Sequence, residues 1–158
     1  MTTWREFCDA APDLAALAES RLTAHKHLTM ATIRRGGAPR ISGTEVTLRS
    51  GEMWLAGMNG ARRFDDLRRD PRVAVHSASE DADSWTGDAK VAGVVSQTRA
   101  PSDFAAFAED PEQPPATDAF ELFRVDITEV VVVRLGEAKD HLVIDSWRAD
   151  RGRKSFRR

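Results

Sequence analysis

Two consecutive arginines, Arg62 and Arg63, follow the turn-forming pair Asn59-Gly60 and open a short amphipathic segment. Apolar residues recur at every third position from 61 to 67, which predicts a short helix that ends before Pro71. A helix N-terminus carries partial positive charge and disfavours cations by roughly 0.3–1 kcal/mol each. An anion bound there would explain both arginines, because backbone N–H groups and guanidinium groups would converge on one phosphate.

The same segment offers a purely structural explanation for this basic pair. Asp65 and Asp66 follow at helical spacing and could neutralise the two arginines by ion pairs worth a few tenths of a kcal/mol each. The residues alone leave both interpretations open. Arg68 and Arg69 stand at the other end of the segment, where the helix dipole favours cations, so they need no ligand to explain them.

The surrounding pattern predicts a mainly β protein with a few short helices. Alternating apolar and polar residues predict strands at 28–33, 39–48, 53–57, 73–77, 90–97, 120–135 and 142–147. A first helix is expected over about 13–24 with Asp13 as its N-cap, and another over 101–109. Gly43 interrupts the alternation of the second strand, which suggests a β-bulge there. Six or seven strands with two or three helices indicate an antiparallel β-barrel with helical inserts.

Composition limits the class of protein. The 158 residues fit a single domain, 1–158, and 41% hydrophobic with 30% charged residues excludes a mainly disordered chain. A net charge of −2 gives no overall attraction to nucleic acid or to a membrane. The lone Cys8, the absence of a signal-peptide pattern and the lack of an apolar run of roughly 20 residues predict a cytoplasmic protein.

Two further features of the sequence are possible binding sites. The tail 148–158 is strongly basic and the segment 103–121 strongly acidic, which is typical of a solvated chain end, an anion site or a subunit contact. His25 and His27 share one face of an extended segment, but no third ligand stands at a recognisable spacing. We therefore predict no metal site.

Residues 51–75 resemble the pyridoxamine 5′-phosphate oxidase-like family of flavin-binding split barrels. The family pattern is a strand, Gly-Ser-Arg-Lys or a variant, a short helix, Asn/Asp-Pro-Arg-Val and a second strand, and here Gly-Ala-Arg-Arg precedes Asp-Pro-Arg-Val. The preceding hairpin segment 39–44 resembles the strand from which the family contacts the flavin phosphate and ring. The segment 88–93 is similar to the family's next strand, whose start faces the isoalloxazine. The resemblance implies a split β-barrel of the FMN-binding-protein type, and a homodimer with the cofactor cleft between its subunits.

The resemblance also assigns cofactor contacts to ten positions and no catalytic residue. Arg63 occupies the family's basic phosphate-binding position, Arg62 the arginine beside it, and Arg40 a further phosphate-contacting position. The full predicted set is Arg40, Ile41, Ser42, Gly57, Met58, Arg62, Arg63, Asp88, Trp147 and Arg157. Ala61 replaces the commoner serine and so removes one hydroxyl donor.

The C-terminal members of this set rest on spacing. Trp147, Arg153 and Arg157 match the family's Trp and the arginines six and ten residues after it. The family's Arg-Leu-His-Asp-Arg reads Arg-Lys-Ser-Phe-Arg here, so the substrate-binding histidine is absent. A tryptophan can cover a flavin edge and arginines can hold phosphate groups.

The resemblance implies an FMN-binding oxidoreductase that acts on a small substrate. One alternative is a reductase of the same fold that uses the deazaflavin F420, which also presents a phosphate and a flat tricycle. A second is a non-catalytic protein that stores or senses a flavin or another phosphorylated ligand. A third is an interaction domain whose basic tail binds an acidic partner. With FMN and with F420 alike, the cofactor performs the redox chemistry, so no nucleophile is needed.

Overall fold

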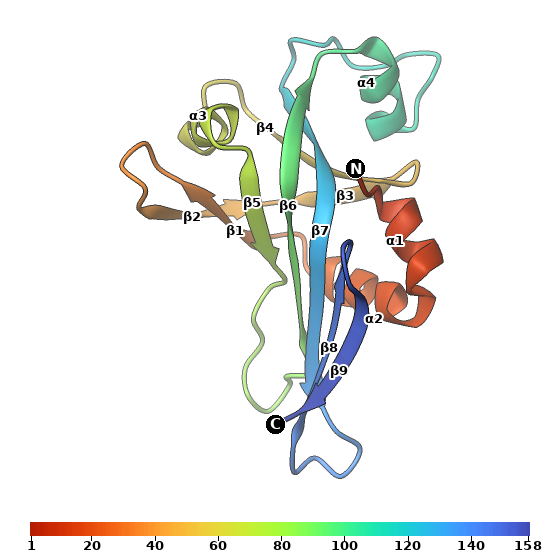
Figure 1. The fold of residues 1–158 in the computed structure, drawn as a ribbon. Helices are drawn as coiled ribbons and strands as arrows, with labels where there is room; N and C mark the ends of the chain where they lie inside the picture. The colour runs from red at the N-terminus through yellow and green to blue at the C-terminus, as the bar shows by residue number, and fades with distance from the viewer.

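A computed structural model describes all 158 residues and contains a single branched antiparallel sheet with four short helices (Figure 1). The strands are β1 (Leu28–Ile33), β2 (Pro39–Thr44), β3 (Val46–Arg49), β4 (Glu52–Gly57), β5 (Arg72–His76), β6 (Asp88–Thr98), β7 (Glu121–Leu135), β8 (Leu142–Arg148) and β9 (Gly152–Arg157). The helices are α1 (Trp4–Ala10), α2 (Pro12–Leu22), α3 (Arg62–Arg69) and α4 (Pro101–Ala108). None of these helices is both long and apolar enough to cross a membrane. The prediction of a mainly β split barrel is confirmed.

The long strand β7 divides the sheet. The strands run in the order β2-β1-β5-β6-β7-β4-β3, and β8 and β9 branch from β7. One edge of β7 pairs with β6 along most of its length, whereas the other edge pairs first with β4 and then, from Glu129, with β8. In the gap between these two partners, the N–H of Ile127 donates to the carbonyl of Thr2 at 2.9 Å. The N-terminal segment therefore occupies the split in the sheet.

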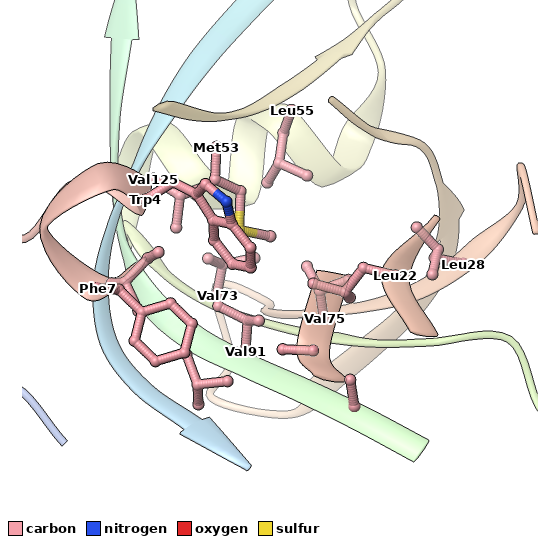
Figure 2. Packing of buried hydrophobic residues seen from close by; sticks show 14 of the residues in the cluster. Trp4, Phe7, Leu22, Leu28, Met53, Leu55, Val73, Val75, Val91 and Val125 are labelled. Atoms are coloured by element: carbon pink, nitrogen blue, oxygen red, sulfur yellow. The ribbon is translucent and has the colours of Figure 1, made fainter. Parts of the chain in front are cut away.

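The core lies between the curved sheet and the first two helices. Figure 2 shows Trp4 and Phe7 of α1 and Leu22 of α2 among apolar side chains from β4, β5, β6 and β7. Phe7 is fully buried and packs against Trp147 of β8, with ring centroids 5.0 Å apart. Burying such side chains stabilises the fold by about 1.5–3 kcal/mol each. This packing holds α1 and α2 against the barrel.

The structure corrects three sequence expectations. The segment predicted as one strand, 39–48, forms two strands separated at Glu45, because β2 pairs with β1 and β3 pairs with β4. The N-terminal helix spans Pro12–Leu22 rather than 13–24, and Ala11 rather than Asp13 is its N-cap. The basic tail 148–158, for which the sequence predicts no strand, mostly forms β9 against β8. All six residues of β9 are exposed, so its sequence lacks the alternation of apolar and polar residues that predicts a strand.

Helix α1 was also absent from the sequence prediction. It carries a capping box in which the N–H of Glu6 donates to the Thr3 hydroxyl and the Glu6 carboxylate accepts from the Thr3 N–H. The Ser/Thr-x-x-Glu spacing is a known sign of a helix start, so this signal was available in the sequence.

Candidate functional site

Helix α3 begins at the Asn59-Gly60 turn, which is held by hydrogen bonds to the first residue of β7 and to the loop before it. Gly60 adopts a φ of 77°, in the left-handed region that favours glycine. Its N–H donates to the carboxylate of Glu121 at 3.1 Å, and the Asn59 side chain donates to the Asp118 carbonyl at 2.8 Å. The N-cap residue, Ala61, makes no side-chain capping hydrogen bond. The turn before α3 is therefore held in place, and no side chain caps the backbone N–H groups at the start of the helix.

Arg63 lies along one wall of a cavity of about 480 Å³. Its guanidinium stacks over the Phe64 ring at 4.6 Å from the centroid, and its Nε is buried without a hydrogen-bond partner. Gly57 allows this path, because a Cβ there would stand 2.6 Å from Arg63 Nη2 and 3.0 Å from the Phe64 ring. Met58 lines the same cavity. Gly57, Met58 and Arg63 of the predicted set are thus brought together.

The remaining walls of this cavity, here called the Arg63 cavity, combine an apolar side with a polar side. The apolar side comes from α4 and the loop after it, where the Phe107 and Phe120 rings lie 5.4 Å apart. The other side is formed by residues just before β1, at the end of β2, between β2 and β3, and on β4: His27, Gly43, Thr44, Glu45 and Ala56. An apolar wall facing a guanidinium suits a flat molecule that carries an anionic group.

Arg62 points into a different cavity. This second space, of about 460 Å³, is lined by Arg35, Arg40, Arg62, Asp65, Asp66 and Arg69 and is called the Arg62 cavity here. Arg62 and Arg63 are the first two residues of α3, and successive helical residues diverge by about 100°. The two guanidinium groups therefore diverge, and the expected convergence on a single point is not present in this chain.

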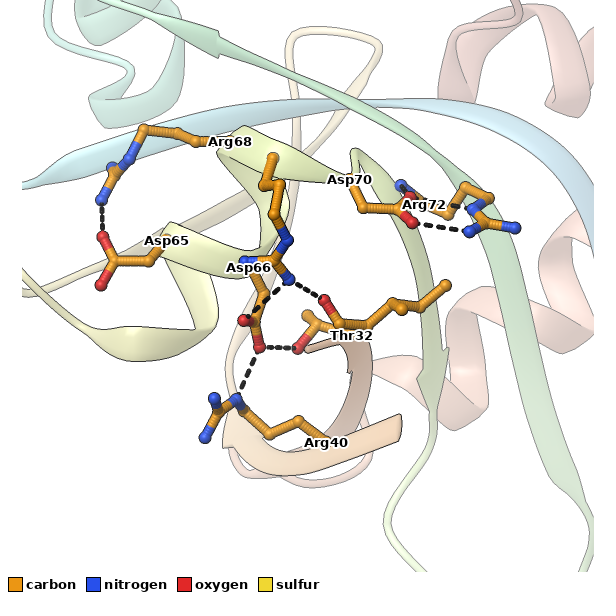
Figure 3. A network of polar contacts seen from close by, with 9 residues as sticks. Thr32, Arg40, Asp65, Asp66, Arg68, Asp70 and Arg72 are labelled. Carbon is orange, nitrogen blue, oxygen red and sulfur yellow. Dashed lines mark hydrogen bonds and ion pairs between the residues drawn. The ribbon is translucent and has the colours of Figure 1, made fainter. Parts of the chain in front are cut away.

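A buried carboxylate network underlies the Arg62 cavity (Figure 3). Asp66 is 3% exposed and accepts hydrogen bonds from Arg40 Nε at 2.6 Å, from the Thr32 hydroxyl at 3.0 Å and from Arg69 at 3.2 Å. Burial alone would raise the pKa of Asp66, but these hydrogen bonds and the charge of Arg40 hold that pKa below its usual value. Asp65 binds Arg68 instead. Neither carboxylate pairs with the N-terminal arginines, so the ion-pair explanation of that pair is wrong.

The other predicted residues lie elsewhere in the chain. Ile41 is 70% exposed and lines a third cavity on the outer sheet face with Ala31, Ala74 and His76. Ser42 is half-buried and pairs with Met30, and Asp88 opens β6 opposite Val133. Trp147 is 6% exposed within the core, and Arg157 lines a fourth cavity together with Arg134 and His141. Within one chain the ten residues do not form a single site.

Sequence reasoning missed the groups that hold and line this region. The sequence pattern suggests Asp66 only as a partner of the N-terminal arginines, whereas in the structure it pairs with Arg69 at the spacing of a helical ion pair. Glu121 is 4% exposed and binds Arg68, Gln97 and the Gly60 N–H. No local pattern marks Glu121, because all its partners are distant in sequence.

Comparison with known proteins gives one family match. The family model described as pyridoxamine 5′-phosphate oxidase matches residues 14–134. These residues include both cavities that flank α3 and most of the sheet. No curated protein matches the sequence.

Solved structures share the fold at low sequence identity. A pyridoxamine 5′-phosphate oxidase-related, FMN-binding protein of Nostoc punctiforme is 12% identical with a TM-score of 0.61, covering 94% of this chain and 95% of its own. A Burkholderia lata protein, solved in complex with tetrahydrophenazine-1-carboxylic acid, is 10% identical with a TM-score of 0.63, covering 98% and 92%. An F420 reductase is 21% identical with a TM-score of 0.52, covering 71% and 94%.

Proposed function

Because the chain belongs to the pyridoxamine 5′-phosphate oxidase family of flavin-binding split barrels, we propose that it is an oxidoreductase that binds FMN in the Arg63 cavity and acts on a small substrate. The observation that carries this proposal is Arg63 itself. Its Nε is buried without a partner, and its guanidinium lies at the wall of a cavity of about 480 Å³. Leaving a buried charged donor unpaired costs about 1–3 kcal/mol or more, which an anionic ligand would offset.

The residues of the Arg63 cavity fit a flavin phosphate on structural grounds. Gly57 leaves the space through which the Arg63 side chain reaches the cavity, and the uncapped N–H groups of α3 add donors of the same sign. Phe107 and Phe120 provide an apolar wall that would exclude water from a flat ring. When bound, FMN supplies hydride-transfer chemistry, and the protein's part is to hold, orient and shield it.

We further propose that the functional unit is a homodimer in the cytoplasm. The outer face of β2, β1, β5 and β6 aligns Ile41, Ala31, Ala74 and Ala92 in one cross-strand row, and Ile41 is 70% exposed. A second copy on this face would cover Ile41 and bring together the parts of the predicted site that lie apart in one chain. In that assembly Ser42, Asp88 and Arg157 would contact cofactor from either subunit, and Trp147 would support β9 from the core.

The F420 reductase among the structural neighbours favours one alternative, a deazaflavin-dependent reductase of the same fold. FMN and F420 differ in their absorbance spectra, so titrating the purified protein with each cofactor separates the two proposals. A protein that binds either cofactor but shows no turnover with NAD(P)H or reduced F420 across a substrate panel would instead be a storage or sensing protein.

The experiment that tests the site is Arg63→Ala. We expect cofactor affinity to fall by roughly 1.5–3 kcal/mol, or about 10- to 150-fold, the scale of hydrogen bonds to charged groups. Fluorescence titration measures the dissociation constant, and a thermal melt checks that the variant is folded. Arg72→Ala is the matched control, because Arg72 is exposed and already paired with Asp70. An unchanged dissociation constant in Arg63→Ala would remove Arg63 from the site.

A further inference from the structure

The cavity on the outer face of the sheet, here called the outer-face cavity, has a volume of about 360 Å³. Two neighbouring cross-strand rows form its floor. Apolar side chains make the first row and polar side chains make the second: Ile41, Ala31 and Ala74, then Thr29, His76 and Lys90. The rows lie two residues apart along β1 and β5, which corresponds to about 6–7 Å. The floor therefore has an apolar half and a polar half side by side.

The polar half presents donors without a counter-charge. Lys90 is exposed, its ammonium group makes no hydrogen bond or ion pair within the chain, and no carboxylate lines the cavity. His76 Nδ1 lies 2.6 Å from the Ser77 carbonyl oxygen, which can only accept, so this nitrogen carries a proton and donates. That bond orients the ring and leaves Nε2 available to a ligand. Because Lys90 and His76 are direct neighbours across β5 and β6, both can contact one anionic group.

The outer-face cavity adjoins the Arg63 cavity along β2. Ile41 lines the outer-face cavity and Gly43 lines the Arg63 cavity, and their spacing of two residues places them on the same face of the strand. Gly43 also pairs with Thr29 of the outer-face cavity. A cofactor in the Arg63 cavity would therefore have the outer-face cavity beside it. The second copy proposed for this face would close the cavity from the opposite side.

Resting on the proposed function, we propose that the outer-face cavity is the substrate-binding site and that the substrate is a small apolar molecule with one anionic group. Its apolar body packs on Ile41, Ala31 and Ala74, and its anion binds Lys90 and His76 in the next row. The spacing of the two rows suits an anionic group attached directly to a small ring or a short chain. A cationic substrate is disfavoured, because it would meet the unpaired charge of Lys90.

The test uses benzoate, an apolar ring with a carboxylate, as the probe of the full-length protein loaded with FMN. Benzoate should bind and change the flavin absorbance spectrum, because the probe lies beside the cofactor. Benzamide lacks the charge and acetate lacks the ring, so each should bind at least about tenfold more weakly. Phenyl phosphate is titrated in parallel, and tighter binding of either anion supports the inference and identifies the anionic group. Isothermal titration calorimetry measures the dissociation constants.

A substitution in the polar half ties the binding of the probe to this cavity. Lys90→Gln should weaken benzoate binding by about tenfold or more and change FMN affinity by less than about twofold, since Lys90 lies outside the Arg63 cavity. Lys139→Gln is the matched control, because Lys139 is an exposed lysine in the turn between β7 and β8 and should leave both affinities unchanged. A thermal melt checks that both variants are folded.

Four results would contradict these proposals. If benzoate binds the wild type and Lys90→Gln equally, or if benzamide binds as tightly as benzoate, the cavity selects no anion and the inference is wrong. Binding that depends on Lys90 but leaves the flavin spectrum unchanged would separate the site from the cofactor, which also overturns the inference. If the FMN-loaded protein binds neither benzoate nor phenyl phosphate, the cavity takes no such substrate, although the proposed function stands. Failure of the wild type to bind FMN overturns the proposed function itself.

Discussion

The two ends of α3 carry the same pair of residues, and their surroundings are opposite. At the C-terminal end, Arg68 binds Glu121 and Asp65, and Arg69 binds Asp66 and the Ile33 carbonyl. At the N-terminal end, Arg62 and Arg63 bind no acidic group, and each lines its own cavity.

Helix electrostatics make this difference informative. The dipole stabilises the C-terminal pair and disfavours the N-terminal pair. The structure satisfies the pair that already lies in a favourable field and leaves the other unsatisfied. Residues that are unfavourable for the local fold are expected at positions that bind a ligand. The C-terminal arginines and their carboxylates should therefore act on stability, and the N-terminal arginines on binding.

The largest effect on stability should come from Asp66→Asn. The change removes the only carboxylate that Arg40 and Arg69 share, and it leaves these two partly exposed guanidinium groups without a counter-charge. We expect the free energy of unfolding to fall by about 3 kcal/mol, the lower end for breaking a buried ion pair because an amide oxygen still accepts a hydrogen bond. Urea denaturation measures the change. Asp65→Asn is the control, since Asp65 is 60% exposed and binds only Arg68, and its effect should be small.

The pH dependence of the free energy of unfolding tests the role of Asp66 in a second way. The pKa of Asp66 in the folded protein lies below its ordinary value of 3.8, so the unfolded chain takes up its proton first as pH falls. The stabilisation by Asp66 is therefore complete at pH values well above about 3.8, the pKa in the unfolded chain. It is lost as pH falls through the lower pKa of the folded protein. Asp66→Asn should flatten the acid limb of the unfolding curve. Equal acid limbs in variant and wild type would show that Asp66 does not control it.

An intermediate effect is expected from Arg68→Gln. The substitution leaves the buried carboxylate of Glu121 with Gln97 and the Gly60 N–H as partners but without its cation. Because Arg68 is only partly buried, we expect a loss of about 1–2 kcal/mol in unfolding free energy. Cofactor affinity should stay within about twofold of the wild type. A large loss of cofactor affinity at unchanged stability would mean that Arg68 acts on binding, as the N-terminal arginines are expected to do. The two ends of α3 would then not differ in role.

The sequence predicted those parts of the molecule that depend on local patterns. The alternation at 28–33, the helix that Pro71 ends and the long strand near 121–135 were all readable, because each depends on its own periodicity. The division of 39–48 was not, since it depends on which distant strand each half pairs with. For the same reason the role of Asp66 was missed, because Thr32 and Arg40 lie 34 and 26 residues away.

The candidate site was only half predictable from the sequence. The position of Arg62 and Arg63 at a helix start followed from the turn and the helical spacing, and the structure agrees. Their separation into two cavities depends on Gly57, Phe64 and the β1–β2 turn, which meet only in the folded chain.

The smallest and most diagnostic effect is expected from Arg62→Ala in the protein without cofactor. Because Arg62 is an exposed, unpaired cation in the first turn of α3, its removal should leave stability unchanged or raise it by about 0.3–1 kcal/mol. Arg69→Ala, the same change at the other end, should lower stability, since Arg69 binds Asp66 and the Ile33 carbonyl. Denaturant titrations at low salt compare the two variants, and added salt should shrink the gain in Arg62→Ala. A loss of stability in Arg62→Ala equal to that in Arg69→Ala would mean that Arg62 serves the fold. Opposite signs would separate an arginine kept for binding from one kept for structure within a single helix of eight residues.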